Sequence, residues 1–180
     1  MLALSFDDRR FRDALGAFPT GVAIVTGVTE NGERLGMTVS SFNSVSIAPP
    51  LVLFSVTRRA HSFEAWTKVS RYAINILSAQ QEELSNRFAR PLADKWTGLA
   101  VLDGETGTPV LPNALAVFEC EPYARYDGGD HEIFVGRVLA LRTTPHKRDL
   151  PLIFFGGRYR HLDASFHDAP PRDASIFEGW

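Results

Sequence analysis

The feature that most constrains the fold is the alternation of short β-branched stretches with tight-turn signals. Residues 20–29 are rich in valine, isoleucine and threonine, and the Asn31-Gly32 pair that follows readily adopts the positive φ of a hairpin turn. Further stretches with strand character follow the hairpin, at 34–39, 51–56, 72–77, 114–126, 132–143 and 152–155. This succession predicts an antiparallel sheet that closes, fully or in part, into a barrel.

A few helices are expected to flank the sheet. Three segments have helical patterning: residues 5–18, 62–68 and 79–89. In the first of them, Phe11, Leu15 and Phe18 recur at helical spacing, and Pro19 ends the pattern. We expect one domain over residues 1–162. The polar residues 163–180 are expected to form a C-terminal extension.

Composition excludes several classes of protein. The chain has 180 residues, 44% hydrophobic and 22% charged, which is typical of a single globular domain. No apolar stretch approaches the roughly 18 residues that a membrane helix needs. The net charge of −2 gives no basic signature for nucleic acid. Cys120 is the only cysteine, so a reducing cytoplasm is expected, and the histidines show no close metal-ligand spacing.

The segment 36–54 carries the strongest functional signal. Within nine residues it supplies five hydroxyl side chains: Thr38, Ser40, Ser41, Ser44 and Ser46. On a single strand all of these except Ser41 would share one face. A row of short hydroxyls beside backbone amides can hold a phosphate or the polar edge of a heterocycle. A solvated strand face is the alternative, but the apolar flanks and Pro49-Pro50 favour a site.

Several motifs in order resemble the small flavin reductases of the flavin-reductase-like family, the NAD(P)H-dependent components of two-component flavin monooxygenases. The resemblance extends from Phe11 to Leu162. The matching residues are Phe18-Pro19-Thr20-Gly21-Val22, Gly36, Thr38, Ser40-Ser41-Phe42, Ser44-Val45-Ser46, Pro49-Pro50-Leu51-Val52, Leu84-Ser85-Asn86-Arg87-Phe88-Ala89, Gly129-Asp130-His131 and Gly157-Arg158-Tyr159.

The resemblance implies a fold and an activity. The fold would be a mainly β split barrel of the Greek-key, FMN-binding type with flanking helices, assembled as a homodimer. The activity would be hydride transfer from NADH or NADPH to FMN or FAD, with reduced flavin passing to a partner monooxygenase. Neither nucleic acid nor a membrane would be a partner. No catalytic side chain is expected, because hydride transfer needs only the two reacting atoms held about 3–3.5 Å apart.

The resemblance also assigns roles to individual residues. Those expected to contact the flavin are Thr38, Val39, Ser40, Ser41, Ser55 and Val56. Its phosphate would be bound by Arg58, Ser62 and Arg87, since a guanidinium fork matches a phosphate. The nicotinamide nucleotide would contact His131 and Tyr159. Four of these residues have an alternative reading. Arg58 would lie in a solvated turn, Arg87 would pair with Glu83 at the surface, His131 would cap a turn, and Tyr159 would pack in the core.

Two other functions fit the same segments. A barrel of this kind can hold a flavin without turnover, as a carrier or sensor. It can also act as an oxidase of the pyridoxamine-phosphate type. The sequence leaves open the choice between FMN and FAD, the choice between NADH and NADPH, and whether the flavin is a bound cofactor or a diffusing substrate.

Overall fold

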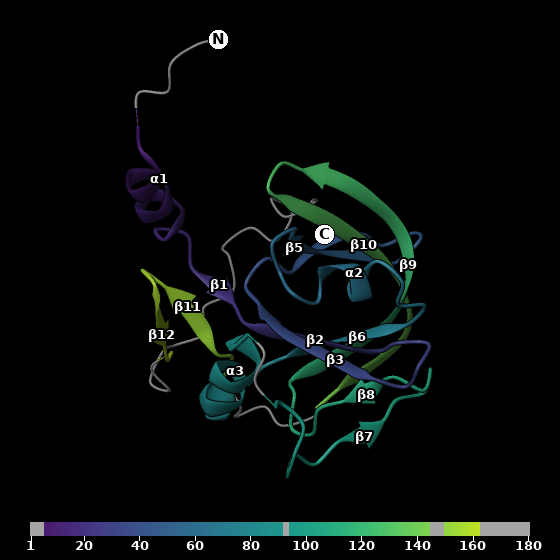
Figure 1. Ribbon diagram of the computed structural model, residues 1–180. Coiled ribbons are helices and arrows are strands. Elements are labelled where there is room, and N and C mark those ends of the chain that lie inside the picture. The colour runs from purple at the N-terminus through teal and green to yellow at the C-terminus, as the bar shows by residue number, and fades with distance from the viewer. Residues whose placement is uncertain (1–5, 92–93, 145–149, 163–180) are drawn as a thin grey trace.

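The computed structural model describes residues 6–91, 94–144 and 150–162. Three helices and one 3-10 turn flank the strands (Figure 1): α1 Asp8–Leu15, α2 Phe63–Trp66, η1 Ala79–Gln81 and α3 Glu82–Ala89. The strands are β1 Thr20–Gly21, β2 Ala23–Val28, β3 Arg34–Val39, β4 Asn43–Ser46, β5 Leu51–Thr57, β6 Tyr72–Ile76, β7 Leu102–Asp103, β8 Pro109–Val110, β9 Ala116–Gly128, β10 His131–Thr143, β11 Ile153–Phe155 and β12 Arg158–Arg160.

The main sheet has seven strands in the order β3-β2-β6-β9-β10-β5-β4, and every pairing is antiparallel. Two small sheets, β1-β11-β12 and β7-β8, lie beside it (Figure 1). The prediction of a mainly β, antiparallel fold with few helices is therefore confirmed.

One apolar core joins strands that are distant in the order of the sheet. Phe54 of β5 is fully buried and packs on Tyr72 of β6 and Phe134 of β10, with each pair of ring centroids 5.3 Å apart. Val39 of β3 belongs to the same cluster. The sheet therefore curls around this core, as Figure 1 shows. A second cluster, which includes Phe88 of α3, lies on the other side of β2.

The hairpins follow the sequence signals. Gly32 has φ of 80° between β2 and β3, as the Asn-Gly pair predicts, and Gly129 has φ of 76° between β9 and β10. One prediction is wrong: the hydroxyl-rich segment is not a single strand. β3 ends at Val39, and β4 begins only at Asn43. In a continuous strand, side chains alternate between the two faces. The turn between β3 and β4 interrupts this alternation, so the hydroxyls before and after it need not share a face.

Helix α1 lies away from the main sheet (Figure 1). Asp7 caps the helix by accepting a hydrogen bond from the Arg10 amide at 2.7 Å. Its apolar positions are exposed, with Leu15 at 59% and Phe18 of the following turn at 74%. No described residue of this chain buries them.

None of the described helices is long and apolar enough to cross a membrane.

The thiol of Cys120 gives a first testable prediction. Cys120 is fully buried on β9; burial, and then the charge of Glu119, raise the pKa of its thiol to about 12. Since the thiolate is the reactive form, the native protein at pH 8 should not react with a disulfide reagent such as DTNB. One thiol per chain should react after denaturation. Rapid stoichiometric labelling of the native protein would contradict this burial.

Candidate flavin site

A groove runs along β3 and is made of three adjoining cavities, which we call the β3 groove. The first cavity, of about 590 Å³, lies between β3, the turn after β5 and the C-terminal end of α3, and its lining includes Thr38, Ser62 and Ala89. The second, of about 250 Å³, shares Thr38 and Ala89 with the first. The third, of about 240 Å³, shares Ser40 with the second and extends to α1.

The β3 groove brings together five of the residues that the sequence assigned to the site. They are Thr38, Val39, Ser40, Ser62 and Tyr159. Three of them lie on or just after β3, Ser62 precedes α2, and Tyr159 lies on β12. The middle of the groove combines these hydroxyls with apolar walls from Val22 and Phe154. Such a lining suits a flat heterocycle with polar edges.

The one hydrogen of the Thr38 hydroxyl is already used in a hydrogen bond. The hydroxyl donates to the backbone carbonyl of Ser85 on α3 at 2.7 Å. A hydroxyl has one hydrogen and two lone pairs, so Thr38 is left with acceptor capacity only. Toward the groove it can therefore accept a hydrogen bond from a ring N–H or an amide, but it cannot donate one in this arrangement.

Tyr159 lines the second cavity together with Thr38. Its hydroxyl is 2.8 Å from the Ser85 hydroxyl, and either oxygen can be the donor. Its ring packs edge-on against Phe154 at a centroid distance of 5.6 Å. The hydrogen bond and the ring contact together fix the orientation of Tyr159 beside the groove.

Three of the residues predicted to contact the flavin make other contacts within the protein. The Ser41 hydroxyl accepts a hydrogen bond from the Ser55 amide at 2.9 Å and so ties the β3–β4 turn to β5. The side chain of Val56 points into the core, since the residue is only 2% exposed. Flavin contact stays a prediction for Ser41, Ser55 and Val56. Because the side chain of Val56 is buried, only its backbone could make such a contact.

Arg58 is held by carboxylates. Its guanidinium makes ion pairs with Asp127 at 2.8 Å and Glu132 at 2.9 Å, and its Nε donates to the Gly129 carbonyl at 3.3 Å. All three nitrogens therefore have partners on the β9–β10 hairpin. Two of the five guanidinium N–H donors are not used by these bonds, and Arg58 as a phosphate contact stays a prediction.

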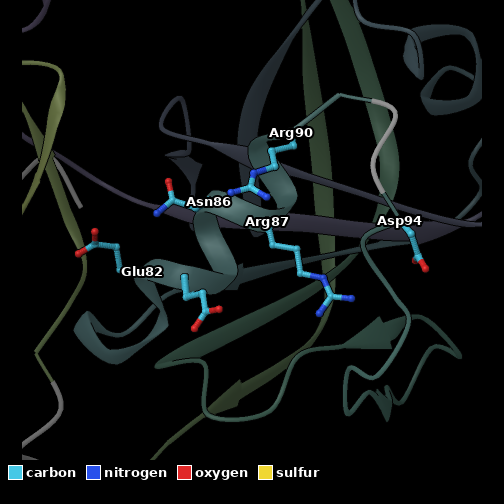
Figure 2. A pocket seen from close by; sticks show the side chains of 6 residues that line it. Glu82, Asn86, Arg87, Arg90 and Asp94 are labelled. Carbon is cyan, nitrogen blue, oxygen red and sulfur yellow. The ribbon is translucent and has the colours of Figure 1, made fainter.

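Arg87 lies on the outer side of α3, along a further cavity of about 560 Å³ (Figure 2), which adjoins the first cavity of the β3 groove at Arg90 and Asp94. Its guanidinium donates to the Thr97 carbonyl, and the i, i+4 ion pair with Glu83 does not form among the described residues. The neighbouring Arg90 lines both this cavity and the β3 groove. Arg87 as a phosphate contact stays a prediction. Of the two arginines near the end of α3, it is Arg90 that lines the groove.

His131 begins β10 and does not line the groove. Its Nδ1 is 2.7 Å from a carboxylate oxygen of Asp130, and this hydrogen bond, followed by the charge of His131, lowers the pKa of Asp130. In the sheet it pairs with Thr57, which does line the groove. His131 is therefore one strand away from the site, and its contact with a nicotinamide nucleotide stays a prediction.

The sequence analysis missed basic residues beside the groove: Arg34, Arg90 and Lys95 line its first cavity. The Lys95 ammonium donates to the carbonyls of Gly36 and Phe88, both at 2.9 Å, and burial lowers its pKa. Local patterning could not identify Lys95, because it lies in a segment without regular structure. Within the described ranges, no group of histidine, cysteine and acidic residues is suited to hold a metal ion.

Comparisons with known proteins identify the family of this chain. The chain is 44% identical over 158 residues to the FMN reductase (NADH) SmoA of Agrobacterium fabrum, with 85% of each chain covered. It is 33% identical over 162 residues to HsaB of Mycobacterium tuberculosis, the reductase subunit of a flavin-dependent monooxygenase, with 90% of this chain and 86% of HsaB covered. Two curated relatives from Rhizobium meliloti are longer, and the chain spans 46% and 63% of their lengths.

A solved structure extends the likeness to three dimensions. The NADH:FAD oxidoreductase SgcE6 of Streptomyces globisporus, in complex with NAD and FAD fragments, superposes with a TM-score of 0.81 at 36% identity. The superposition covers 95% of this chain and all of SgcE6. Residues 15–163 match the model of the Flavin reductase like domain, which includes every strand that forms the β3 groove. The chain therefore belongs to the flavin-reductase-like family.

Proposed function

We propose that this chain is an NAD(P)H:flavin oxidoreductase that reduces FMN or FAD in the β3 groove. The observation that carries the proposal is the lining of two adjoining cavities of the groove: basic residues line the first, Tyr159 and apolar walls line the second, and Thr38 lines both. The names of SmoA and SgcE6 support NADH as the donor and both FMN and FAD as acceptors in this family.

The residues present fit a flavin. A bound flavin supplies the electron acceptor for the hydride of NADH or NADPH. Thr38 accepts a hydrogen bond from the heterocycle, while Val22 and Phe154 exclude water from the middle of the groove. Ser62 and Arg90 are positioned at the first cavity to bind phosphate. The chain thus acts by binding and orienting its two ligands, without a protein nucleophile.

Reduced flavin then passes to a monooxygenase component. HsaB, a reductase subunit by name, supports this partner. We further propose that the chain forms a Greek-key split barrel and a homodimer. The domain would span residues 1–162, with an extension at 163–180, and the protein would be cytoplasmic. The apolar face of α1, which no residue in the described part of the chain covers, is consistent with burial in a dimer.

The test is the absorbance at 340 nm when the purified protein meets NADH or NADPH, with FMN, FAD or no added flavin. Decay that requires flavin is the expected result, and the fastest pair identifies the donor and acceptor. Flavin retained through gel filtration without any decay would instead indicate a carrier or sensor. Hydrogen peroxide formed from pyridoxamine phosphate would indicate the oxidase alternative.

A further inference from the structure

Ser85 is a fully buried polar residue that touches both walls of the β3 groove without lining it. Its backbone carbonyl accepts the Thr38 hydroxyl at 2.7 Å, and its own hydroxyl lies 2.8 Å from that of Tyr159. Thr38 comes from β3 and Tyr159 from β12, so one residue of α3 joins two otherwise separate elements. A buried hydroxyl with such a partner has a defined position, because leaving it unpaired would cost free energy.

The helix that carries Ser85 is well anchored. Phe88, one turn further on, is 1% exposed and packs edge-on against Trp96 at 5.0 Å. Lys95 donates to the Phe88 carbonyl at the end of the helix. Ala89, at i+4 from Ser85, lines the groove, so the face of α3 that holds Ser85 is the face turned toward the site. The packing of α3 therefore holds Ser85 in a defined position relative to Thr38 and Tyr159.

We propose that Ser85 is a positioning residue for hydride transfer: its hydroxyl sets the orientation of Tyr159, and its carbonyl sets that of Thr38. The inference rests on the proposed function, in which Thr38 contacts the flavin, and on the sequence prediction that Tyr159 contacts the nicotinamide nucleotide. The two contacts differ in kind, since one uses the side chain of Ser85 and the other its backbone. Mutation of Ser85 therefore affects the Tyr159 wall and spares the Thr38 wall.

Ser85→Ala should raise the KM for NADH about fivefold, the effect of losing one hydrogen bond that orients a ligand-binding side chain. The dissociation constant for flavin, measured by fluorescence titration in the absence of NADH, should stay within about twofold, because the carbonyl that holds Thr38 is retained. Ser70→Ala is the matched control, since it removes the same group from an exposed serine. It should change neither quantity.

A double-mutant cycle tests whether Ser85 acts through Tyr159. If it does, adding Ser85→Ala to Tyr159→Phe should change the KM for NADH no further. An equal additional loss in the double variant would overturn the proposal, as would a weakening of flavin binding as large as the rise in KM. Thermal unfolding of each variant identifies a loss of structure. Absence of NAD(P)H oxidation in the wild-type protein would instead refute the proposed function.

Discussion

Gly36→Ala should weaken flavin binding at least tenfold and lower the stability of the chain by about 2 kcal/mol, the usual cost of overpacking a core. A Cβ at Gly36 would lie 2.3 Å from a ring carbon of Phe88 and 3.0 Å from Trp96. Neither ring can retreat easily, because Phe88 is buried and packs against Trp96. The strain must therefore be relieved by moving α3 away from β3.

Such a movement acts directly on the site. Helix α3 carries Ala89, which lines the groove, and Ser85, which holds Thr38. Fluorescence titration with FMN or FAD measures the binding loss. A thermal scan should show a fall in Tm of about 4–8 °C for a chain of this size.

Gly21→Ala provides the matched control for Gly36→Ala. A Cβ at Gly21 would meet no atom within 4 Å, and Gly21 does not have a positive φ. This variant should retain wild-type flavin affinity and Tm. If Gly36→Ala behaved in the same way, the close packing of β3 against α3 would not be important for the site.

Glu119→Gln should destabilise the folded chain by about 3 kcal/mol at pH 7, because it disturbs a buried carboxylate and removes hydrogen-bond acceptors that several N–H and O–H donors share. Glu119 is 2% exposed. It accepts hydrogen bonds from the amides of Glu105 at 2.9 Å and Thr106 at 2.7 Å, from the Thr106 hydroxyl at 2.6 Å and from the Thr108 hydroxyl at 3.2 Å. These bonds hold the β7–β8 hairpin against β9.

The pH dependence follows from the same carboxylate. Burial alone would raise the pKa of Glu119, but the hydrogen bonds from Thr106, Glu105 and Thr108 outweigh it and hold the pKa below its ordinary value of 4.5. The stabilisation is therefore present above that ordinary value and is lost as the pH falls through the lowered pKa of the folded state. Urea unfolding between pH 7 and pH 3 should show less dependence on pH in Glu119→Gln than in the wild type.

Glu121→Gln is the matched control for Glu119→Gln. Glu121 lies two residues away on β9 and makes ion pairs with Arg71 at 3.2 Å and Arg137 at 3.6 Å at the surface. Such pairs contribute about 0–1 kcal/mol. A loss for Glu121→Gln as large as that for Glu119→Gln would show that the hydrogen bonds of the buried carboxylate are not the source of the stability.

The sequence by itself determined the features that depend on local backbone preference. β-branched stretches placed the main strands, and Asn31-Gly32 placed a hairpin at Gly32. The ordered motifs identified the family and singled out Thr38, Ser40 and Tyr159, which the structure brings into one groove. These features are local because φ/ψ preference and side-chain alternation act over a few residues.

Only the tertiary structure decided which partners the polar side chains have. It paired Arg58 with Asp127 and Glu132, 69 and 74 residues away, and placed Arg87 on the outer side of α3. It also set the Ser85 hydroxyl against that of Tyr159, 74 residues further along the chain. Hydrogen bonds and ion pairs form between whatever groups the packed core brings within about 3 Å, and sequence spacing does not encode that proximity.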